Sequence, residues 1–220
     1  MNNSIEKYVK ENRRKFLNYI AEVTEDIMED EDELESLTDK YFDNTTFEFD
    51  EGASKKVIIF DKLGFVLKWD NQGDSCREVT LYEEAVQKSL ADFFPYTAVI
   101  CEHLGYDWII QEIAKPFFTY YRKDIREMQK TIKTHQQGLD ILYNMFCDIP
   151  NCTRTDCLSA DWLKIAAGFF GLTLTGKLAR FVQENRINDL HSGNVGFIGK
   201  RPVLIDFCGY HWDEDYYKYS

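Results

Sequence analysis

The segment RINDLHSGNVGF, residues 186–197, carries oxygen-bearing side chains at a spacing that suits chemistry on a phosphate. Asp189 and Asn194 lie five positions apart around a small turn, and Asp206 follows twelve positions later, after a short apolar stretch. The residues between Asn194 and Asp206 predict two short strands joined by a turn. A hairpin places its two flanks side by side, so Asn194 and Asp206 are expected to point at one spot.

The types of these side chains indicate a magnesium ion. Amide and carboxylate oxygens are hard ligands, which suit Mg²⁺ that is held partly by phosphates. Asp189 would lie nearby without binding the metal, where it could receive the proton of a hydroxyl group. This division of roles is the one that phosphoryl transfer uses. The alternative is that Asp189 and Asn194 are turn and cap residues, as Asp and Asn often are.

A cation for the phosphates is expected at Lys68. The stretch GFVLKWD, residues 64–70, alternates as a strand. A lysine that points inward from a strand needs a partner, because a buried unpaired charge is very costly. Glu78 lies on the apolar stripe of the next predicted helix and ranks first as this partner, with Glu84 second. The alternative is an edge-strand lysine that guards against aggregation.

The elements that must position these residues form a sheet-rich half followed by a helical half. The expected strands lie in 46–60, 64–70, 98–114 and 195–207, and the expected helices lie in 4–29, 76–94, 120–148, 159–170 and 174–185. A turn is expected at Gly52. This order predicts an α+β fold with two lobes, and a cleft between lobes is a usual place for a ligand.

The composition limits the classes of partner that the protein is expected to bind. The net charge of −12 excludes general nucleic-acid binding, which needs a basic face, although a locally positive site could still bind an anion. The run TEDIMEDEDELES, residues 24–36, has eight carboxylates and no base, and is expected to be a solvated helix face or a linker. The sequence has neither a membrane span nor the apolar core of a signal peptide, so a cytoplasmic protein with reduced cysteines is expected.

The order FVLKW, a helix with a glutamate, WIIQEIA, NDLHSGN and LIDFCG resembles the protein kinase-like superfamily. DLHSGN is closer to the D-x-H-x-G-N form of aminoglycoside and choline phosphotransferases and of the short kinases encoded by bacteriophages. The resemblance covers about residues 46–212. It implies an N-lobe of antiparallel sheet with one helix in 46–115 and a truncated helical C-lobe in 116–220. The helical pattern and the acidic run place an additional N-terminal helix and acidic segment in 1–45.

The resemblance also implies ATP and Mg²⁺ as cofactors and a role for each site residue. Asp189 would be the catalytic base, and Asn194 and Asp206 would bind the metal. Lys68 would hold the α and β phosphates, with Glu78 as its ion-pair partner. Gly52 would lie in the loop over the nucleotide, Gln111 would be the gatekeeper, the backbone of Glu112, Ile113 and Ala114 would meet the adenine, and His191 would brace the catalytic loop by hydrogen bonds.

The function that the resemblance implies is transfer of a phosphate from ATP to a hydroxyl, by a phage-like Ser/Thr protein kinase. One alternative is a pseudokinase-like binding module that presents acidic surfaces, or its N-terminal helix, to a protein partner. The single glycine of DEGASKK and the expected lack of a helical subdomain after Asp206 favour that module. A small-molecule kinase or a nucleotidyl transferase on the same scaffold would also fit these residues.

Overall fold

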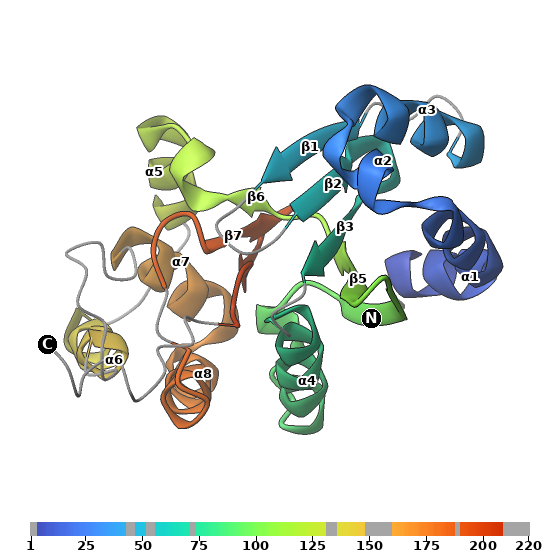
Figure 1. Ribbon diagram of the computed structural model, residues 1–220. Helices are drawn as coiled ribbons and strands as arrows, with labels where there is room; N and C mark the ends of the chain where they lie inside the picture. Colours follow the sequence, from blue (N-terminus) through green and yellow to red (C-terminus); the bar gives the residue numbers. More distant parts are fainter. Residues whose placement is uncertain are drawn as a thin grey trace, which may run out of the picture. The chain divides into compact units, whose positions relative to one another are not determined.

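The computed structural model describes residues 4–42, 47–51, 56–70, 74–130, 136–147, 160–187 and 190–208 (Figure 1). The chain divides into two compact units: residues 1–84 with 95–113, and residues 85–94 with 114–220. Each unit combines helices with an antiparallel sheet, so the predicted α+β class is confirmed. No helix in the described ranges is both long and apolar enough to cross a membrane.

The first unit is built on a five-stranded antiparallel sheet. Its strands follow the spatial order β1-β2-β3-β5-β4, with bounds β1 Phe47–Glu51, β2 Lys56–Phe60, β3 Phe65–Asp70, β4 Thr97–His103 and β5 Tyr106–Glu112. A short 3₁₀ turn, Asp61–Leu63, joins β2 to β3. The expected hairpin of residues 98–114 is present as β4 and β5.

Helix α4, Asp74–Gln87, connects β3 to β4 and is shorter than the helix expected over 76–94. Ser89 takes a left-handed φ of 59°, and the Leu90 N–H turns back to the Ala85 carbonyl at 2.7 Å. These two features end the helix before Pro95, and a 3₁₀ turn, Ala91–Phe93, follows. The helix therefore stops through a local backbone reversal, which apolar periodicity does not reveal.

Three helices rather than one open the chain: α1 Ser4–Glu22, α2 Glu25–Glu29 and α3 Glu31–Tyr41. The prediction of a single helix over residues 4–29 is wrong, because the helix is interrupted at Thr24. Thr24 Oγ1 accepts the Ile27 N–H at 3.2 Å and caps α2, and Asp30 Oδ1 accepts the Glu33 N–H at 3.0 Å and caps α3. The acidic run thus supplies helix caps and first-turn carboxylates, which the helix dipole stabilises.

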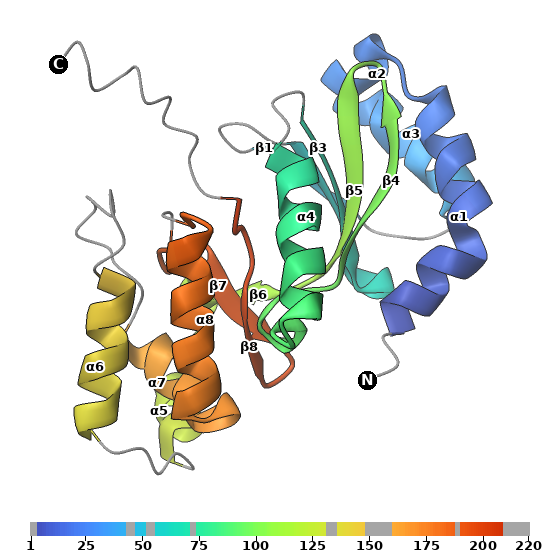
Figure 2. The same ribbon diagram turned by 90° about the horizontal axis from the view of Figure 1, so that it is seen from below.

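These N-terminal helices cover one face of the sheet, and α4 lies on the other (Figure 2). The covered face is aromatic: the ring of Phe16 lies 5.5 Å from that of Phe65, and the ring of Phe42 lies 5.0 Å from that of Phe60. The stacked rings of Trp69 and Trp108 lie 4.5 Å apart. Side chains that alternate along β3 therefore meet two different environments, an aromatic core and the underside of α4.

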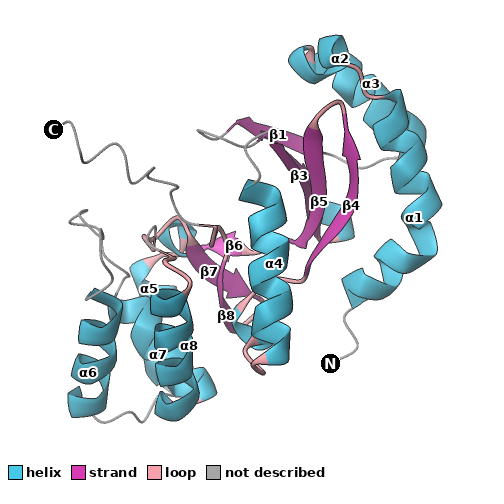
Figure 3. Cartoon of the chain, turned by 60° about the horizontal axis from the view of Figure 1, so that its bottom comes forward, coloured by secondary structure: helices cyan, strands magenta, loops and turns pink. Residues whose placement is uncertain are grey.

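The second unit combines helices with a three-stranded sheet of order β6-β7-β8 (Figure 3). Its elements are β6 Lys115–Pro116, a 3₁₀ turn Phe117–Thr119, α5 Arg122–Lys130, α6 Gln136–Cys147, α7 Ala160–Phe170, α8 Leu172–Glu184, β7 Val195–Ile198 and β8 Arg201–Leu204. The helix predicted over 120–148 corresponds to α5 and α6, with residues 131–135 outside the described ranges. The late hairpin is present, with Val195 opposite Leu204.

Gly196 controls how closely β6 approaches β7. Pro116 pairs with Gly196, and a Cβ on Gly196 would lie 2.2 Å from the Lys115 carbonyl oxygen. The Gly196 carbonyl also accepts a hydrogen bond from the buried Trp162 indole at 3.1 Å. The hairpin that precedes Asp206 is therefore held against both β6 and α7 at a position that has no room for a side chain.

Gly196→Ala is expected to lower the free energy of unfolding by ~1–3 kcal/mol, because backbone must move to admit the methyl group. Gly176→Ala is the matched control. Gly176 lies inside α8, where a Cβ would lie an ordinary 3.7 Å from Leu142. That variant is expected to be ~1 kcal/mol more stable through helix propensity. Urea unfolding followed by circular dichroism measures both, and equal effects of the two changes would contradict this explanation of the close approach.

Candidate functional site

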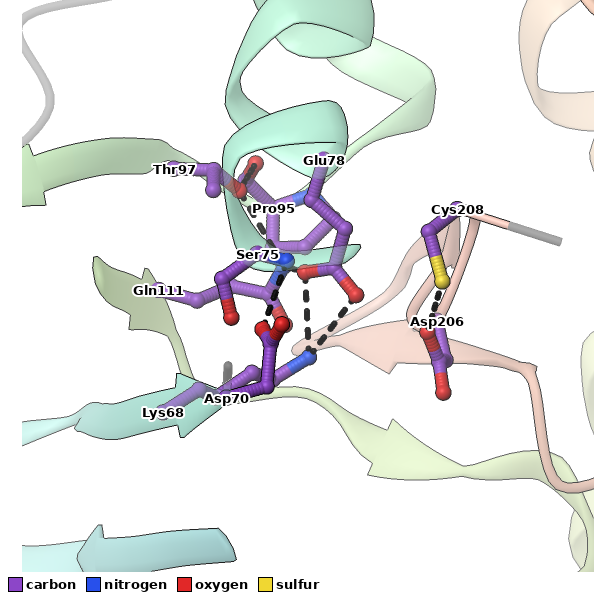
Figure 4. A network of polar contacts seen from close by, with 9 residues as sticks. All are labelled: Lys68, Asp70, Ser75, Glu78, Pro95, Thr97, Gln111, Asp206 and Cys208. Carbon is purple, nitrogen blue, oxygen red and sulfur yellow. Dashed lines mark hydrogen bonds and ion pairs between the residues drawn. The ribbon is translucent and has the colours of Figure 1, made fainter. Parts of the chain in front are cut away.

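A buried ion pair joins β3 to α4. Lys68 Nζ lies 3.2 Å from Glu78 Oε2 and 3.5 Å from Oε1, and the two side chains are 8% and 0% exposed (Figure 4). The structure thus pairs Lys68 with the first-ranked partner, Glu78, and not with Glu84. An enclosed pair of this kind attracts strongly but also loses its hydration, so its surroundings must supply further hydrogen bonds.

Strand alternation and helix periodicity create the pair. Leu67 and Trp69 belong to the aromatic core under the N-terminal helices, which leaves Lys68 on the face under α4. Glu78 lies on the buried stripe of α4 together with Leu81 and Ala85. Both side chains therefore point into the layer between the sheet and the helix, as their sequence patterns predict.

Asp70 fixes where α4 begins. Its Oδ1 accepts the Asp74 N–H at 3.0 Å and its Oδ2 accepts the Ser75 N–H at 2.7 Å. A carboxylate on the first N–H groups of a helix satisfies them and favours the helix dipole. Since Glu78 lies one turn further on, this cap also positions Glu78. This role was not predicted from the sequence, although an aspartate just before a predicted helix is an available signal.

Gln111 completes the network around Glu78. Its Nε2 donates to Glu78 Oε2 and to Thr97 Oγ1, both at 3.1 Å, and the Thr97 hydroxyl donates to the Pro95 carbonyl at 3.1 Å (Figure 4). Gln111 and Thr97 are buried. The position expected to act as the gatekeeper thus contributes a donor to the Glu78 carboxylate. The hydrogen bond from Gln111 to Thr97 was not predicted from the sequence.

The stretch expected to meet an adenine begins at the end of β5. The Glu112 N–H donates to the Tyr96 carbonyl at 2.8 Å, and the Ile113 N–H donates to the Gly64 carbonyl at 2.9 Å. These two N–H groups are therefore engaged within the first unit and are not available to a ligand. The boundary between the two units falls between Ile113 and Ala114.

In the second unit, His191 makes hydrogen bonds within the turn before β7. Its Nδ1 accepts the Gly193 N–H at 2.9 Å, and its carbonyl accepts the Asn194 N–H at 3.0 Å. Because Nδ1 accepts, the proton of a neutral ring lies on Nε2. A Cβ on Gly193 would lie 2.7 Å from the ring, so any larger residue there would require the His191 ring to move. These contacts hold Asn194 at a defined place.

Asn194 and Asp206 flank the open end of the β7–β8 hairpin. The Ile205 N–H donates to the Asn194 carbonyl at 2.9 Å, one step beyond the Val195–Leu204 pair. Both Asn194 and Asp206 are half-buried. An amide oxygen and a carboxylate at one hairpin end fit the donor set that Mg²⁺ prefers when phosphates and water complete its coordination.

Two neighbours of Asp206 fix the segment that follows β8. The Phe207 ring is fully buried, 4.8 Å from the ring of Phe94. The Cys208 thiol donates weakly to Asp206 Oδ1, with a sulfur–oxygen distance of 3.5 Å (Figure 4). The thiol contact was not predicted, and its only signal was a cysteine two positions after the aspartate.

Two expected site residues, Asp189 and Gly52, lie outside the described ranges. Their roles stay predictions. The described residues form two groups: Lys68, Glu78 and Gln111 meet in the first unit, and His191, Asn194 and Asp206 gather at the β7–β8 hairpin of the second.

The thiols of the first unit do not suit nucleophilic chemistry. Burial, followed by a hydrogen bond to Asp107, raises the pKa of the Cys76 thiol to about 11. Burial also raises the pKa of Cys101. Both groups therefore stay protonated at neutral pH, whereas a reactive cysteine needs a lowered pKa.

No family model matches the chain, and no curated protein matches it. Among solved structures, the chain is similar to APH(2″)-IIa in its ternary complex with streptomycin and ATP. The two share 13% sequence identity with a TM-score of 0.34, over 81% of this chain and 70% of that chain. A likeness at this level carries no argument about the site.

Single changes in the ion pair are expected to destabilise the protein far more than a double change. Lys68→Met leaves the buried Glu78 carboxylate without its cation and should cost ~3–5 kcal/mol, as should Glu78→Leu, whereas the double variant should recover most of this loss. Urea unfolding followed by tryptophan fluorescence reports on the sheet through Trp69 and Trp108. The exposed Glu83→Gln on α4 is the control, expected within ~0.5 kcal/mol of the parent. A Lys68→Met variant as stable as the parent would contradict the ion pair.

Proposed function

We propose that this protein is an ATP- and Mg²⁺-dependent phosphotransferase that transfers the γ-phosphate to a hydroxyl group. The single observation that carries the proposal is the buried Lys68–Glu78 pair, with its supporting hydrogen bond from Gln111. Apolar residues of similar volume would often stabilise the same layer as well as an ion pair does. A lysine enclosed at this cost therefore favours a role in binding an anion.

The pair is suited to a polyphosphate for electrostatic reasons. Glu78 holds the Lys68 ammonium in one orientation, and an ammonium group has three N–H donors. The remaining donors would bind oxygens of the α and β phosphates. Since the lysine side chain is only 8% exposed, little water screens this attraction.

Asn194 and Asp206 would hold the Mg²⁺ ion, which supplies neutralisation of phosphate charge when bound. Asp189, five positions before Asn194, would accept the proton of the attacking hydroxyl. A bond forms between the hydroxyl oxygen and the γ-phosphorus, the bond to the bridging oxygen breaks, and ADP leaves with that oxygen. His191 would contribute by holding the turn between these residues rather than by moving a proton.

The proposed acceptor is a serine or threonine of a protein, following the resemblance to phage-type kinases. A small-molecule hydroxyl is the alternative acceptor. Phosphate transfer is separable from nucleotidyl transfer by the position of the label, because γ-labelled ATP marks the product of a kinase and α-labelled ATP that of a nucleotidyl transferase.

A second candidate function is a binding module that presents acidic helices to a partner. It is favoured by the occupied N–H groups of Glu112 and Ile113, which weaken the case for adenine recognition, and by the exposed carboxylates of α2 and α3. The two functions differ in a simple way: the enzyme requires a nucleotide, and the module does not.

ATP with Mg²⁺ is expected to stabilise the protein by ~2.7 kcal/mol at a ligand concentration 100 times the Kd. Asp206→Ala should remove the Mg²⁺-dependent part of this gain, because a metal ligand is lost. Asp92→Asn, an exposed change in the same unit, should keep it. Thermal unfolding with ATP, with and without Mg²⁺, measures the effect. No stabilisation by any nucleotide would favour the binding module.

Asp189→Asn is expected to lower turnover ~10²–10⁴-fold, because the amide cannot accept the proton, while ATP binding stays nearly unchanged. Transfer from γ-labelled ATP to proteins of a host lysate measures turnover, and thermal stabilisation by ATP and Mg²⁺ checks binding. Full activity of the Asp189→Asn protein would show that the role assigned to Asp189 is wrong.

A further inference from the structure

The second unit has an open hollow that the proposed reaction does not use. Its volume is about 370 Å³, and it lies between the segment that follows α4 and one face of α8. Three cations, one carboxylate and two apolar side chains line it: Lys88, Lys177, Arg180, Glu184, Leu90 and Phe181. The hollow is therefore positively charged, in a chain whose net charge is −12.

The floor of the hollow is formed by two buried apolar side chains. Leu90 and Phe181 are only 2% and 1% exposed. Lys88 Nζ lies 5.3 Å from the centroid of the Phe181 ring and 3.1 Å from Glu184 Oε2. The ring and the carboxylate thus hold this lysine at the rim, so one of the three cations is oriented in advance.

The other two cations lie three positions apart on α8, one turn of the same helix face. Lys177 and Arg180 are exposed, and neither forms an ion pair or a hydrogen bond with any part of the chain that the structure describes. In a protein with 38 acidic and 26 basic side chains, two adjacent cations without a carboxylate partner in the described ranges are unexpected. Their charge is available to a ligand.

We propose that this hollow binds a multiply charged phosphate group. A guanidinium fork matches two phosphate oxygens, and the ammonium groups add point charges around them. The volume lies within the range of small-molecule sites, ~300–1,000 Å³. The proposal does not depend on the proposed phosphotransferase activity, because it uses none of the residues assigned to that reaction.

Two sources of the group share this chemistry: a free polyphosphate, including that of a nucleotide, and a phosphate on a peptide side chain. The buried floor offers little apolar surface for flanking residues of a peptide. Free tripolyphosphate is therefore the first probe, and a phosphoserine peptide with its unphosphorylated form is the second. Stronger binding of one probe than of the other identifies the source.

Isothermal titration of tripolyphosphate into the full chain, with excess EDTA to remove divalent metals, tests the site. The double change Lys177→Ala/Arg180→Ala is expected to weaken binding at least ~10-fold, since two charge-assisted contacts are lost. Lys123→Ala/Arg126→Ala is the matched control, with the same residue types and spacing on the exposed face of α5. It should change the affinity by less than ~2-fold. The EDTA removes the metal through which Asn194 and Asp206 would bind a polyphosphate, which separates this site from the proposed metal site.

Glu184→Gln provides a second test, in which binding of tripolyphosphate is expected to become stronger and not weaker. Removing the one carboxylate of the hollow should tighten tripolyphosphate binding ~2–5-fold. Glu127→Gln on α5, whose carboxylate pairs with Lys130, changes the net charge equally and should have no comparable effect. Unchanged affinity in Lys177→Ala/Arg180→Ala, or equal losses in this variant and its α5 control, would overturn the proposal, because attraction would then follow net charge and not the hollow.

Discussion

The buried ion pair between Lys68 and Glu78 imposes the strictest condition on the first unit. Two charges out of water are tolerated only where their remaining hydrogen-bonding groups are satisfied and their positions are fixed. β3 fixes the lysine, and the Asp70 carboxylate fixes the start of α4 and with it the glutamate. Gln111 then adds a second donor to Glu78 Oε2, the oxygen that lies closest to Lys68 Nζ. Loss of either charged partner would leave the other enclosed without a counter-charge, and loss of Gln111 would remove a hydrogen bond from the carboxylate.

The N-terminal helices matter to the pair even though they lie on the opposite face of the sheet. Every residue of β3 is buried, and this requires cover on both faces. α4 covers one face, and α1 and the end of α3 cover the other through Phe16, Tyr19 and Phe42, whose rings pack against each other and on to Phe60 and Phe65. The sheet that holds Lys68 is thereby kept away from water along its whole third strand. This gives the expected N-terminal helical segment a structural role in the first unit.

The parts of the fold that follow from periodicity could be predicted, and the parts that follow from single side-chain hydrogen bonds could not. Alternation along β3 and the apolar stripe of α4 were sufficient to rank Glu78 above Glu84. The break at Thr24 was missed, since one hydroxyl accepting the Ile27 N–H decides it within a continuous helical pattern. Gln111 reaches Glu78 because the register of β3 and β5 sets it opposite Val66. That register depends on how the strands pair in the folded protein, and local sequence patterns do not determine it.

Some basic side chains of the second unit bond to other groups of the protein, whereas others remain available to a ligand. The Arg201 guanidinium donates to the carbonyls of Asp92 at 3.0 Å and Phe94 at 3.1 Å, and so ties β8 to the segment before β4. Lys88 belongs to the same segment and is held by Glu184. Both cations satisfy groups of the protein itself. Lys177 and Arg180 satisfy none in the ranges described, yet they lie beside Lys88 on a surface already shaped by Leu90 and Phe181. With acidic groups in excess across the chain, pairing these two with a nearby carboxylate would have been the simpler arrangement. Glu184, the one carboxylate of the hollow, is instead paired with Lys88, which leaves Lys177 and Arg180 without an ion pair among the described residues.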